Sequence, residues 1–281
     1  MRITESCAQC LYDKQKHLTD NEEYLAEIRH LLDRRKKNDT SPYMVYLFNQ
    51  VYEKYFGKHA SYKDIKKKYN DLVLSIEDTI RDKIDCSENS IAMALVYARI
   101  GNYIDFGAMN NVDEEMFLSL FDNATLQDRD REVTEAFIKQ CKNAHNFLLI
   151  TDNCGEIVLD KLFLEQLHKS FPKLKINVLV RGGEVLNDAT EEDAKYVGID
   201  KVGEVISNGL PIAGTIYELL PAAAKAIMDN ADVILAKGQG NYESLCGQGK
   251  HIFYSFLCKC ELFTNRFHVP KLTGIFMEEL E

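Results

Sequence analysis

Carboxylate and amide side chains stand together in residues 151–156, directly after an apolar run. Asp152 and Asn153 offer neighbouring oxygen atoms, the kind of ligand that hard divalent metal ions take in proteins. Gly155 and Glu156 follow them at the start of a helical pattern. An Asp-Asn pair is more commonly a turn or a helix cap, so a metal site requires support from other segments.

The elements that must position this segment are apolar runs rich in β-forming residues, separated by helical stretches. These runs are residues 147–150, 176–180, 201–206, 233–236 and 252–257. Such alternation predicts a mainly parallel sheet. In an open α/β sheet the loops at the carboxyl ends of the strands gather at one edge, where ligands bind.

The loops that follow the first four predicted strands all contain glycine and polar side chains. The polar candidates in them are Asp152, Asn153, Arg181, Asp188, Asn208, Lys237 and Asn241. If the loops converge, they supply two carboxylates and a carboxamide for a metal, and two cationic side chains for an anion. Taken by itself, Asp188 could equally be the cap of the next helix. Residues 238–241 lack the full pattern of a phosphate-binding loop.

Residues 1–140 are helical in character, because their apolar residues recur at helical intervals. Ser6 and Gln9 have the spacing of a capping box, and Pro42 stands at the start of another helix. The lysine cluster in residues 63–68 is interpreted as a solvated helix face. We expect an α/β protein whose helical domain, residues 1–140, packs on a Rossmann-like, mainly parallel α/β domain, residues 141–281, that carries the metal site.

Composition and charge argue against several classes of function. The formal net charge of −10 argues against a nucleic-acid partner, because phosphate backbones are held by clustered basic residues. The sequence contains no apolar run of about 18 residues, so it predicts no membrane span, and the amino terminus lacks a signal pattern. The eight cysteines in 281 residues are interpreted as reduced thiols. These features predict a cytoplasmic protein; its oligomeric state stays open.

Taken together, the segments resemble the metal-dependent damage-control phosphatase family, long catalogued as a domain of unknown function. The likeness is to its stand-alone members, which carry an amino-terminal Cys-x-x-Cys. The matching segments occur in order along the chain and are residues 7–10, 101–107, 152–156, 181–183, 187–190 and 236–243. The resemblance therefore covers nearly the whole chain.

The resemblance implies that Asp152, Asn153 and Asp188 bind one divalent metal ion. All-oxygen ligands favour Mn or Mg, with Co or Ni able to substitute in vitro. It places Lys237 against the substrate phosphate, so that Asp152, Asp188 and Lys237 are the catalytic candidates. The substrate-binding candidates that follow are Asn102, Asp105, Gly155, Glu156, Arg181, Lys237 and Asn241.

The implied reaction is hydrolysis of phosphate monoesters of small phosphorylated metabolites, such as damaged sugar phosphates or cofactor-related compounds. Lys237, with Arg181, would stabilise the phosphoryl oxygens. Water is the preferred attacking group, with Asp152 as the alternative nucleophile. Two other functions stay open: a non-catalytic module that binds a phosphometabolite, and a methyltransferase that uses S-adenosylmethionine. The methyltransferase is disfavoured because no glycine-rich loop follows the first strand.

The cysteine pairs have two interpretations. Cys7 and Cys10 fall on one face of the first predicted helix, a spacing that suits a metal or a redox pair. A structural zinc site would need two further ligands, for which Cys258 and Cys260 are the remote candidates. The alternative is that these small residues pack in the interior, as free cysteines commonly do.

Overall fold

The computed structural model describes residues 1–103, 119–122 and 124–280, so Asp105 lies outside the described residues. Its sheet has six strands in the order β3-β2-β1-β4-β5-β6. The strands are β1 (Asn146–Ile150), β2 (Lys175–Val180), β3 (Glu204–Ser207), β4 (Val233–Lys237), β5 (Ile252–Leu257) and β6 (Gly274–Glu279). Strands β1 to β5 are parallel and β6 is antiparallel to β5. This is a Rossmann-like order, which confirms the predicted fold class.

Two details of the sheet differ from the sequence prediction. Strand β3 begins at Glu204 rather than at residue 201, because Gly198 adopts a left-handed conformation and Ile199–Lys201 forms a 3-10 turn. Strand β6 was not predicted, and it pairs along the full length of β5. It lies at the edge of the sheet, beyond the strands that carry the site.

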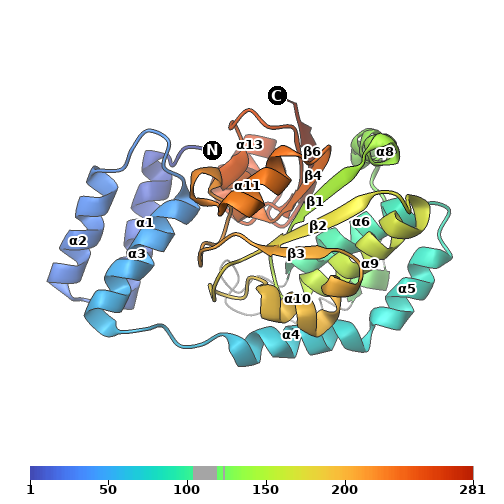
Figure 1. Ribbon diagram of the computed structural model, residues 1–281. Coiled ribbons are helices and arrows are strands. Elements are labelled where there is room, and N and C mark those ends of the chain that lie inside the picture. The colour runs from blue at the N-terminus through green and yellow to red at the C-terminus, as the bar shows by residue number, and fades with distance from the viewer. Residues whose placement is uncertain (104–118, 123, 281) are drawn as a thin grey trace.

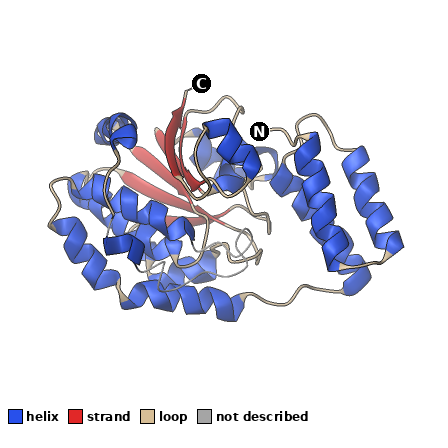
Figure 2. Cartoon of the chain, turned by 180° about the vertical axis from the view of Figure 1, so that it is seen from behind, coloured by secondary structure: helices blue, strands red, loops and turns tan. Residues whose placement is uncertain are grey.

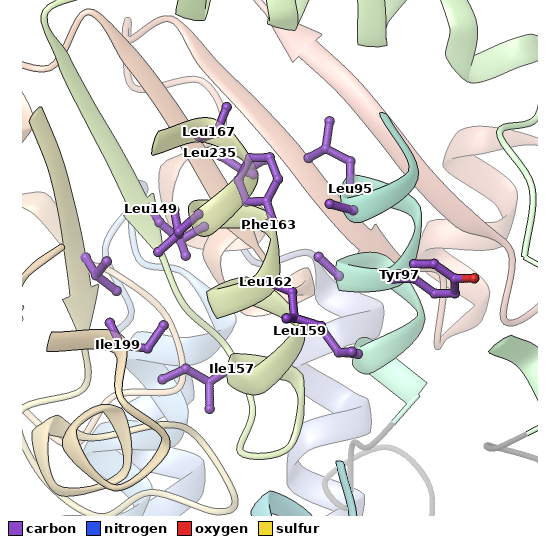
Figure 3. Close-up of a cluster of buried hydrophobic side chains, with 14 of the residues drawn as sticks. Leu95, Tyr97, Leu149, Ile157, Leu159, Leu162, Phe163, Leu167, Ile199 and Leu235 are labelled. Carbon is purple, nitrogen blue, oxygen red and sulfur yellow. The ribbon is translucent and has the colours of Figure 1, made fainter. Parts of the chain in front are cut away.

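Alternate residues of each strand enter different cores, as a sheet covered on both faces requires. Phe147 and Leu149 pack with helices on one face, whereas Leu148 and Ile150 pack on the other. Helices α9 (Glu156–Ser170) and α10 (Glu191–Val197) belong to the first face. Helices α11 (Ala222–Asp229), α12 (Gln239–Leu245) and α13 (Glu261–Phe267) belong to the second. Figure 3 shows the first core, with Leu149 and Leu235 against α9.

The helical region contains two packing units. Helices α1 (Glu5–Leu18), α2 (Glu22–Asp33) and α3 (Ser41–Phe56) enclose a core of their own and stand beside the sheet (Figures 1 and 2). Helices α4 (Lys63–Ser75), α5 (Glu77–Asp85), α6 (Ser90–Ile100) and α8 (Asp128–Asn143) instead contribute to the core that covers the sheet. Residue 140, the expected boundary, lies within α8, and the core that covers the sheet draws on residues from both sides of it.

Local expectations in the helical region had mixed outcomes. Helix α3 begins at Ser41 with Pro42 in its first turn, as predicted. Thr4, rather than Ser6, caps α1, because the Thr4 side chain accepts a hydrogen bond from the Cys7 N–H. The lysine cluster is not wholly solvated, since Lys66 is only 4% exposed. Of the helices that the structure describes, none is long and apolar enough to cross a membrane.

Candidate active site

The loops after β1 and β2 are joined by their backbones. Asn153 and Asp188 form an isolated antiparallel bridge, and the Ala189 N–H donates to the Asp152 carbonyl at 2.8 Å. This pairing places the Asp-Asn pair beside Asp188, as predicted from the strand ends. Asp188 does not cap α10, because Thr190 is the N-cap and shares a capping box with a residue of that helix.

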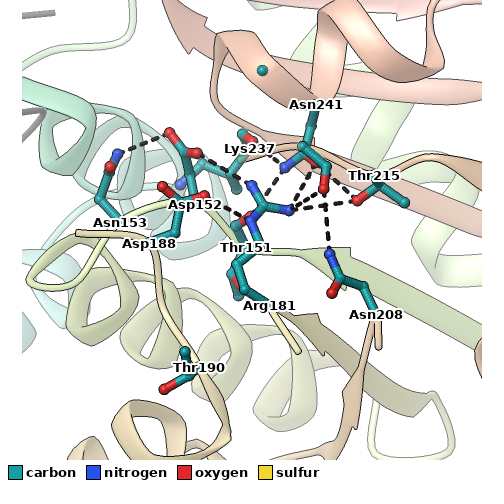
Figure 4. A network of polar contacts seen from close by, with 12 residues as sticks. Thr151, Asp152, Asn153, Arg181, Asp188, Thr190, Asn208, Thr215, Lys237 and Asn241 are labelled. Atoms are coloured by element: carbon teal, nitrogen blue, oxygen red, sulfur yellow. Dashed lines mark hydrogen bonds and ion pairs between the residues drawn. The ribbon is translucent and has the colours of Figure 1, made fainter. Parts of the chain in front are cut away.

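Amide groups surround the Asp152 carboxylate, which is 8% exposed. Nδ2 of Asn102 and Nδ2 of Asn153 each donate to Oδ2 of Asp152 at 2.8 Å (Figure 4 shows the second bond). The same two nitrogens also donate to Oε2 of Glu156, each at 2.9 Å. Asn102 lies in the short 3-10 helix η1 (Gly101–Tyr103) that follows α6, so the helical region reaches this site.

The electrostatic field at Asp152 is dominated by burial and by other acids. Burial, the negative charge of Asp188 and that of Glu156 hold the pKa of Asp152 well above its ordinary value. The positive charges of Lys259 and Arg181 act in the opposite direction but do not cancel the rise. A bound cation would relieve this repulsion.

Arg181 lies at the centre of a second set of contacts (Figure 4) and is 1% exposed. Its Nε donates to Oδ2 of Asp188 at 2.6 Å, and its Nη1 donates to Oδ1 of Asn241 and to the Gly214 carbonyl, both at 3.1 Å. Nδ2 of Asn241 in turn donates to the Lys237 carbonyl at 2.6 Å. Arg181 thus ties the loop after β2 to the loop after β4.

Lys237 has an environment that the sequence did not indicate. Its ammonium group donates to Oδ1 of Asp160 at 2.6 Å and to the Ala98 carbonyl at 3.0 Å, and it pairs with Oε1 of Glu156 at 2.8 Å. The first two contacts are hydrogen bonds and the third is an ion pair, because Oε1 of Glu156 has no hydrogen-bond partner among the described residues. The expected contact between Lys237 and a substrate phosphate therefore stays a prediction.

Glycine is required next to Asp152. Gly238 has φ +82°, and a Cβ atom built there would lie 2.1 Å from Oδ2 of Asp152. Any side chain at this position would displace the carboxylate as well as strain the backbone. The turn after β4 therefore determines where the Asp152 side chain lies.

The donor set of this site fits a hard divalent cation. Within residues 1–103, 119–122 and 124–280, no group of three or more His, Cys, Asp or Glu side chains is arranged to hold a metal ion. A metal here would therefore rest on the carboxylates of Asp152 and Asp188 and on the amide of Asn153. All three are oxygen donors and all are buried, and the acid excess at Asp152 favours a cation.

The cysteines do not form the zinc site that was considered. All eight are free thiols, and Cys258 is fully buried in the apolar core beneath α13. Cys7 and Cys10 lie on α1 and join no metal-binding cluster in the part of the chain that the structure describes. Cys154 packs in the core beside the site, and burial raises the pKa of its thiol.

The structure brings together every predicted site residue that it describes. Those residues are Asn102, Asp152, Asn153, Gly155, Glu156, Arg181, Asp188, Lys237 and Asn241. The sequence analysis missed Lys259, which is 6% exposed and acts electrostatically on Asp152. It lies two residues beyond the end of β5, so the strand-end rule that selected the other loops was sufficient to find it. The sequence analysis also missed Asp160, the partner of Lys237 on α9.

A cleft of about 540 Å³ borders the loop after β2. Residues of α4, the loop 181–184 and the first turn of α10 line it. Glu184 in this loop accepts hydrogen bonds from Ser61 and from the Tyr62 N–H, which fixes the connection that leads into α4.

Comparison with known proteins shows the family and supports the fold. A family model described as the damage-control phosphatase ARMT1-like domain matches residues 2–273. A damage-control phosphatase from Pyrococcus horikoshii is 28% identical, over 96% of each chain. One from Archaeoglobus fulgidus is 28% identical, over 93% of each chain. The crystal structure of a DUF89 family protein from Pyrococcus horikoshii superposes with a TM-score of 0.78, at 26% identity and 99% coverage of both chains.

The fold and site define a Rossmann-like α/β protein with a buried, acid-rich centre at the carboxyl ends of its strands. The chain belongs to the damage-control phosphatase ARMT1-like family. This membership supports a phosphatase role, and therefore hydrolase activity. The subgroup suggested by Cys7 and Cys10 stays a prediction.

Proposed function

We propose that this protein is a metal-dependent phosphatase that hydrolyses phosphate monoesters of small phosphorylated metabolites. The observation that carries the proposal is the meeting of Asp152, Asn153 and Asp188 at one buried point, at the end of parallel strands where ligands bind. Family membership supports the reaction class.

Asp152, Asn153 and Asp188 would hold one divalent ion, Mn or Mg by the hardness of their oxygen donors. When bound, such an ion neutralises charge on a phosphoryl group and lowers the pKa of a coordinated water. The amides of Asn102 and Asn153 fix the Asp152 carboxylate through Oδ2. Gly238 leaves room for that carboxylate.

Lys259 is the cation that we propose for the phosphoryl oxygens. It is buried at the end of β5 and its positive charge acts on Asp152, the first of the proposed metal ligands. A fixed cation stabilises phosphoryl oxygens most strongly where water is excluded. Lys237 is 1% exposed and lies against two buried acids, so we assign it to the neutralisation of Glu156 and Asp160.

Water is the attacking group that the contacts support. Oδ2 of Asp152 accepts hydrogen bonds from both amides, and Oδ1 faces Arg181 at 3.5 Å. A carboxylate held in this way is less available as a nucleophile than a free one. Asp152 is kept as the alternative, and trapping of a phosphorylated enzyme would reveal it.

The proposal is tested by removing metal with EDTA and assaying p-nitrophenyl phosphate after adding back Mg, Mn, Co or Ni singly. We expect turnover to return with Mn or Mg. Asp152→Ala and Asp188→Ala should each lose at least about a hundredfold, the scale seen when a group that stabilises transition-state charge is removed. Asp200→Ala, an exposed acid in a turn of the α/β part, is the matched control and should retain activity.

The proposal would be overturned if the two site variants turned over substrate as fast as the wild type. It would also be overturned if no metal restored turnover to the EDTA-treated protein. In the second case the protein is better explained as a phosphometabolite-binding module. A rise in melting temperature with S-adenosylmethionine, and none with divalent metals, would favour the methyltransferase instead. A screen of phosphorylated metabolites with the active form then identifies the substrate.

A further inference from the structure

Helix α4 contacts both loops of the proposed metal site from outside. It packs against α9 and α10, the helices that follow those loops. Lys66 and Asn70 lie one helical turn apart on α4, and they are 4% and 1% exposed. Polar side chains this deeply buried require specific partners.

Asn70 holds the first loop. Its Oδ1 accepts a hydrogen bond of 2.6 Å from the N–H of Gly155, two residues beyond Asn153. Gly155 has φ +79° and is the N-cap of α9, and no side chain caps that helix end. Nδ2 of Asn70 has no hydrogen-bond partner among the described residues. An unpaired buried amide nitrogen destabilises a fold, which is typical of residues that serve a site rather than the core.

Lys66 holds the second loop through one intermediate residue. Its Nζ lies 2.6 Å from Oδ2 of Asp193 on α10. The same oxygen accepts hydrogen bonds from the N–H of Thr190 at 2.9 Å and from its hydroxyl at 2.6 Å. Thr190 lies two residues beyond Asp188. Burial alone would raise the pKa of Asp193, but the hydrogen bonds from Lys66 and Thr190 outweigh it and lower that pKa.

We infer that α4 holds the two ligand-bearing loops of the metal site in position, with Lys66 and Asn70 as positioning residues. Each fixes a residue two positions beyond a proposed metal ligand, so together they determine how far apart the two ligand-bearing loops lie. The inference rests on the proposed function, because it concerns affinity for the same metal. Groups that orient metal ligands affect metal affinity strongly even though they do not touch the ion.

The test is the affinity for Mn²⁺ measured by calorimetry on EDTA-treated protein. Asn70→Ala and Lys66→Met should each weaken Mn²⁺ binding by about tenfold to a hundredfold. Asn70→Asp keeps an oxygen that accepts the Gly155 N–H bond, so it should bind Mn²⁺ at least as tightly as the wild type. The matched control is Lys68→Met, because Lys68 is exposed and its ammonium group lies over the ring of Tyr69 on the same helix.

A purely structural role would give a different pattern. In that case Asn70→Ala and Lys66→Met would lower the melting temperature of the metal-free protein while the folded fraction bound Mn²⁺ as the wild type does. That result overturns the inference and leaves the proposed function intact. A wild type that binds no Mn²⁺ overturns both. If Asn70→Ala does not fold, Lys66→Met carries the same test, with kcat at saturating Mn²⁺ as the second measurement.

Discussion

Two buried clusters at the strand ends have the same composition but different contacts. Each contains one cation and two carboxylates, and each lies at the end of a parallel strand. We call them the Arg181 cluster, Arg181 with Asp152 and Asp188, and the Lys237 cluster, Lys237 with Glu156 and Asp160.

In the Lys237 cluster the cation lies close to both acids. Its three ammonium contacts span 2.6 to 3.0 Å, and both of its acids lie on one face of α9, where the helix fixes their spacing. The Arg181 cluster is uneven: Arg181 lies 2.6 Å from Asp188 but 3.5 Å from Asp152, and it shares its other donors with neutral oxygens. The loops rather than a helix carry its acids.

This difference separates a structural cluster from a functional one. Where the cation lies 2.6 and 2.8 Å from the two acids, the cluster links β4, α6 and α9. Where one acid stays poorly compensated, as Asp152 does, the site attracts a further cation. Burial of several charges is therefore not enough to identify a metal site; the distances between the cation and its two acids distinguish the two clusters.

The largest effect should come from removing the cation of the Lys237 cluster. Lys237→Met leaves two buried carboxylates without their cation and should reduce the free energy of unfolding by about 3–5 kcal/mol. Urea unfolding at pH 8 measures this change. Adding Glu156→Gln and Asp160→Asn should restore part of the loss. A Lys237→Met protein of unchanged stability that loses only turnover would show instead that Lys237 contacts the substrate.

A smaller effect should follow from Gly238→Ala, which disturbs the Arg181 cluster. The new Cβ would lie 2.1 Å from the Asp152 carboxylate, in a backbone with φ +82°. Gly247→Ala is the matched control, because φ is +79° there and nothing lies within 4 Å of the new Cβ. Both variants are strained at positive φ; at Gly238, where ψ is 154°, the strain is on the order of 1–3 kcal/mol. Only Gly238→Ala should also lose Mn²⁺ affinity; equal affinities would contradict the geometry described for Asp152.

The smallest effect concerns pH. Burial, offset in part by Lys237, raises the pKa of Asp160 to about 7. The folded state therefore holds a proton that the unfolded chain releases near its ordinary pKa, so this group's contribution to stability is lost as pH rises towards 7. Unfolding of EDTA-treated protein should show a weaker decline between pH 4 and 7 in Asp160→Asn. Asp152, whose pKa is also raised, titrates in the same sense and keeps part of the slope. An unchanged slope would contradict the assignment.

Much of the fold was predictable because strand burial leaves a direct pattern. The apolar runs of β1 and β4 are continuous, as strands covered on both faces require, and the carboxyl-end rule placed Asp152, Asn153 and Asp188 together. Strand β6 escaped prediction because it is an antiparallel edge strand with a mixed, partly exposed pattern.

The environment of the site was less predictable, since it depends on contacts between distant segments. Lys237 meets Asp160 and the end of α6 only after the sheet and helices have packed. Lys66 belongs to a lysine-rich segment, and nothing in that segment distinguishes the one buried lysine from its exposed neighbours. Lys259 follows the fifth strand, whereas the candidate loops were those after the first four.

The most direct test of the central claim is a crystal of the protein grown with MnCl₂ and measured at the manganese absorption edge. The account predicts one anomalous peak per chain, bound by the carboxylates of Asp152 and Asp188 and by the amide oxygen of Asn153. An anomalous peak elsewhere, with these three side chains bonded only to one another and to Arg181, would contradict it.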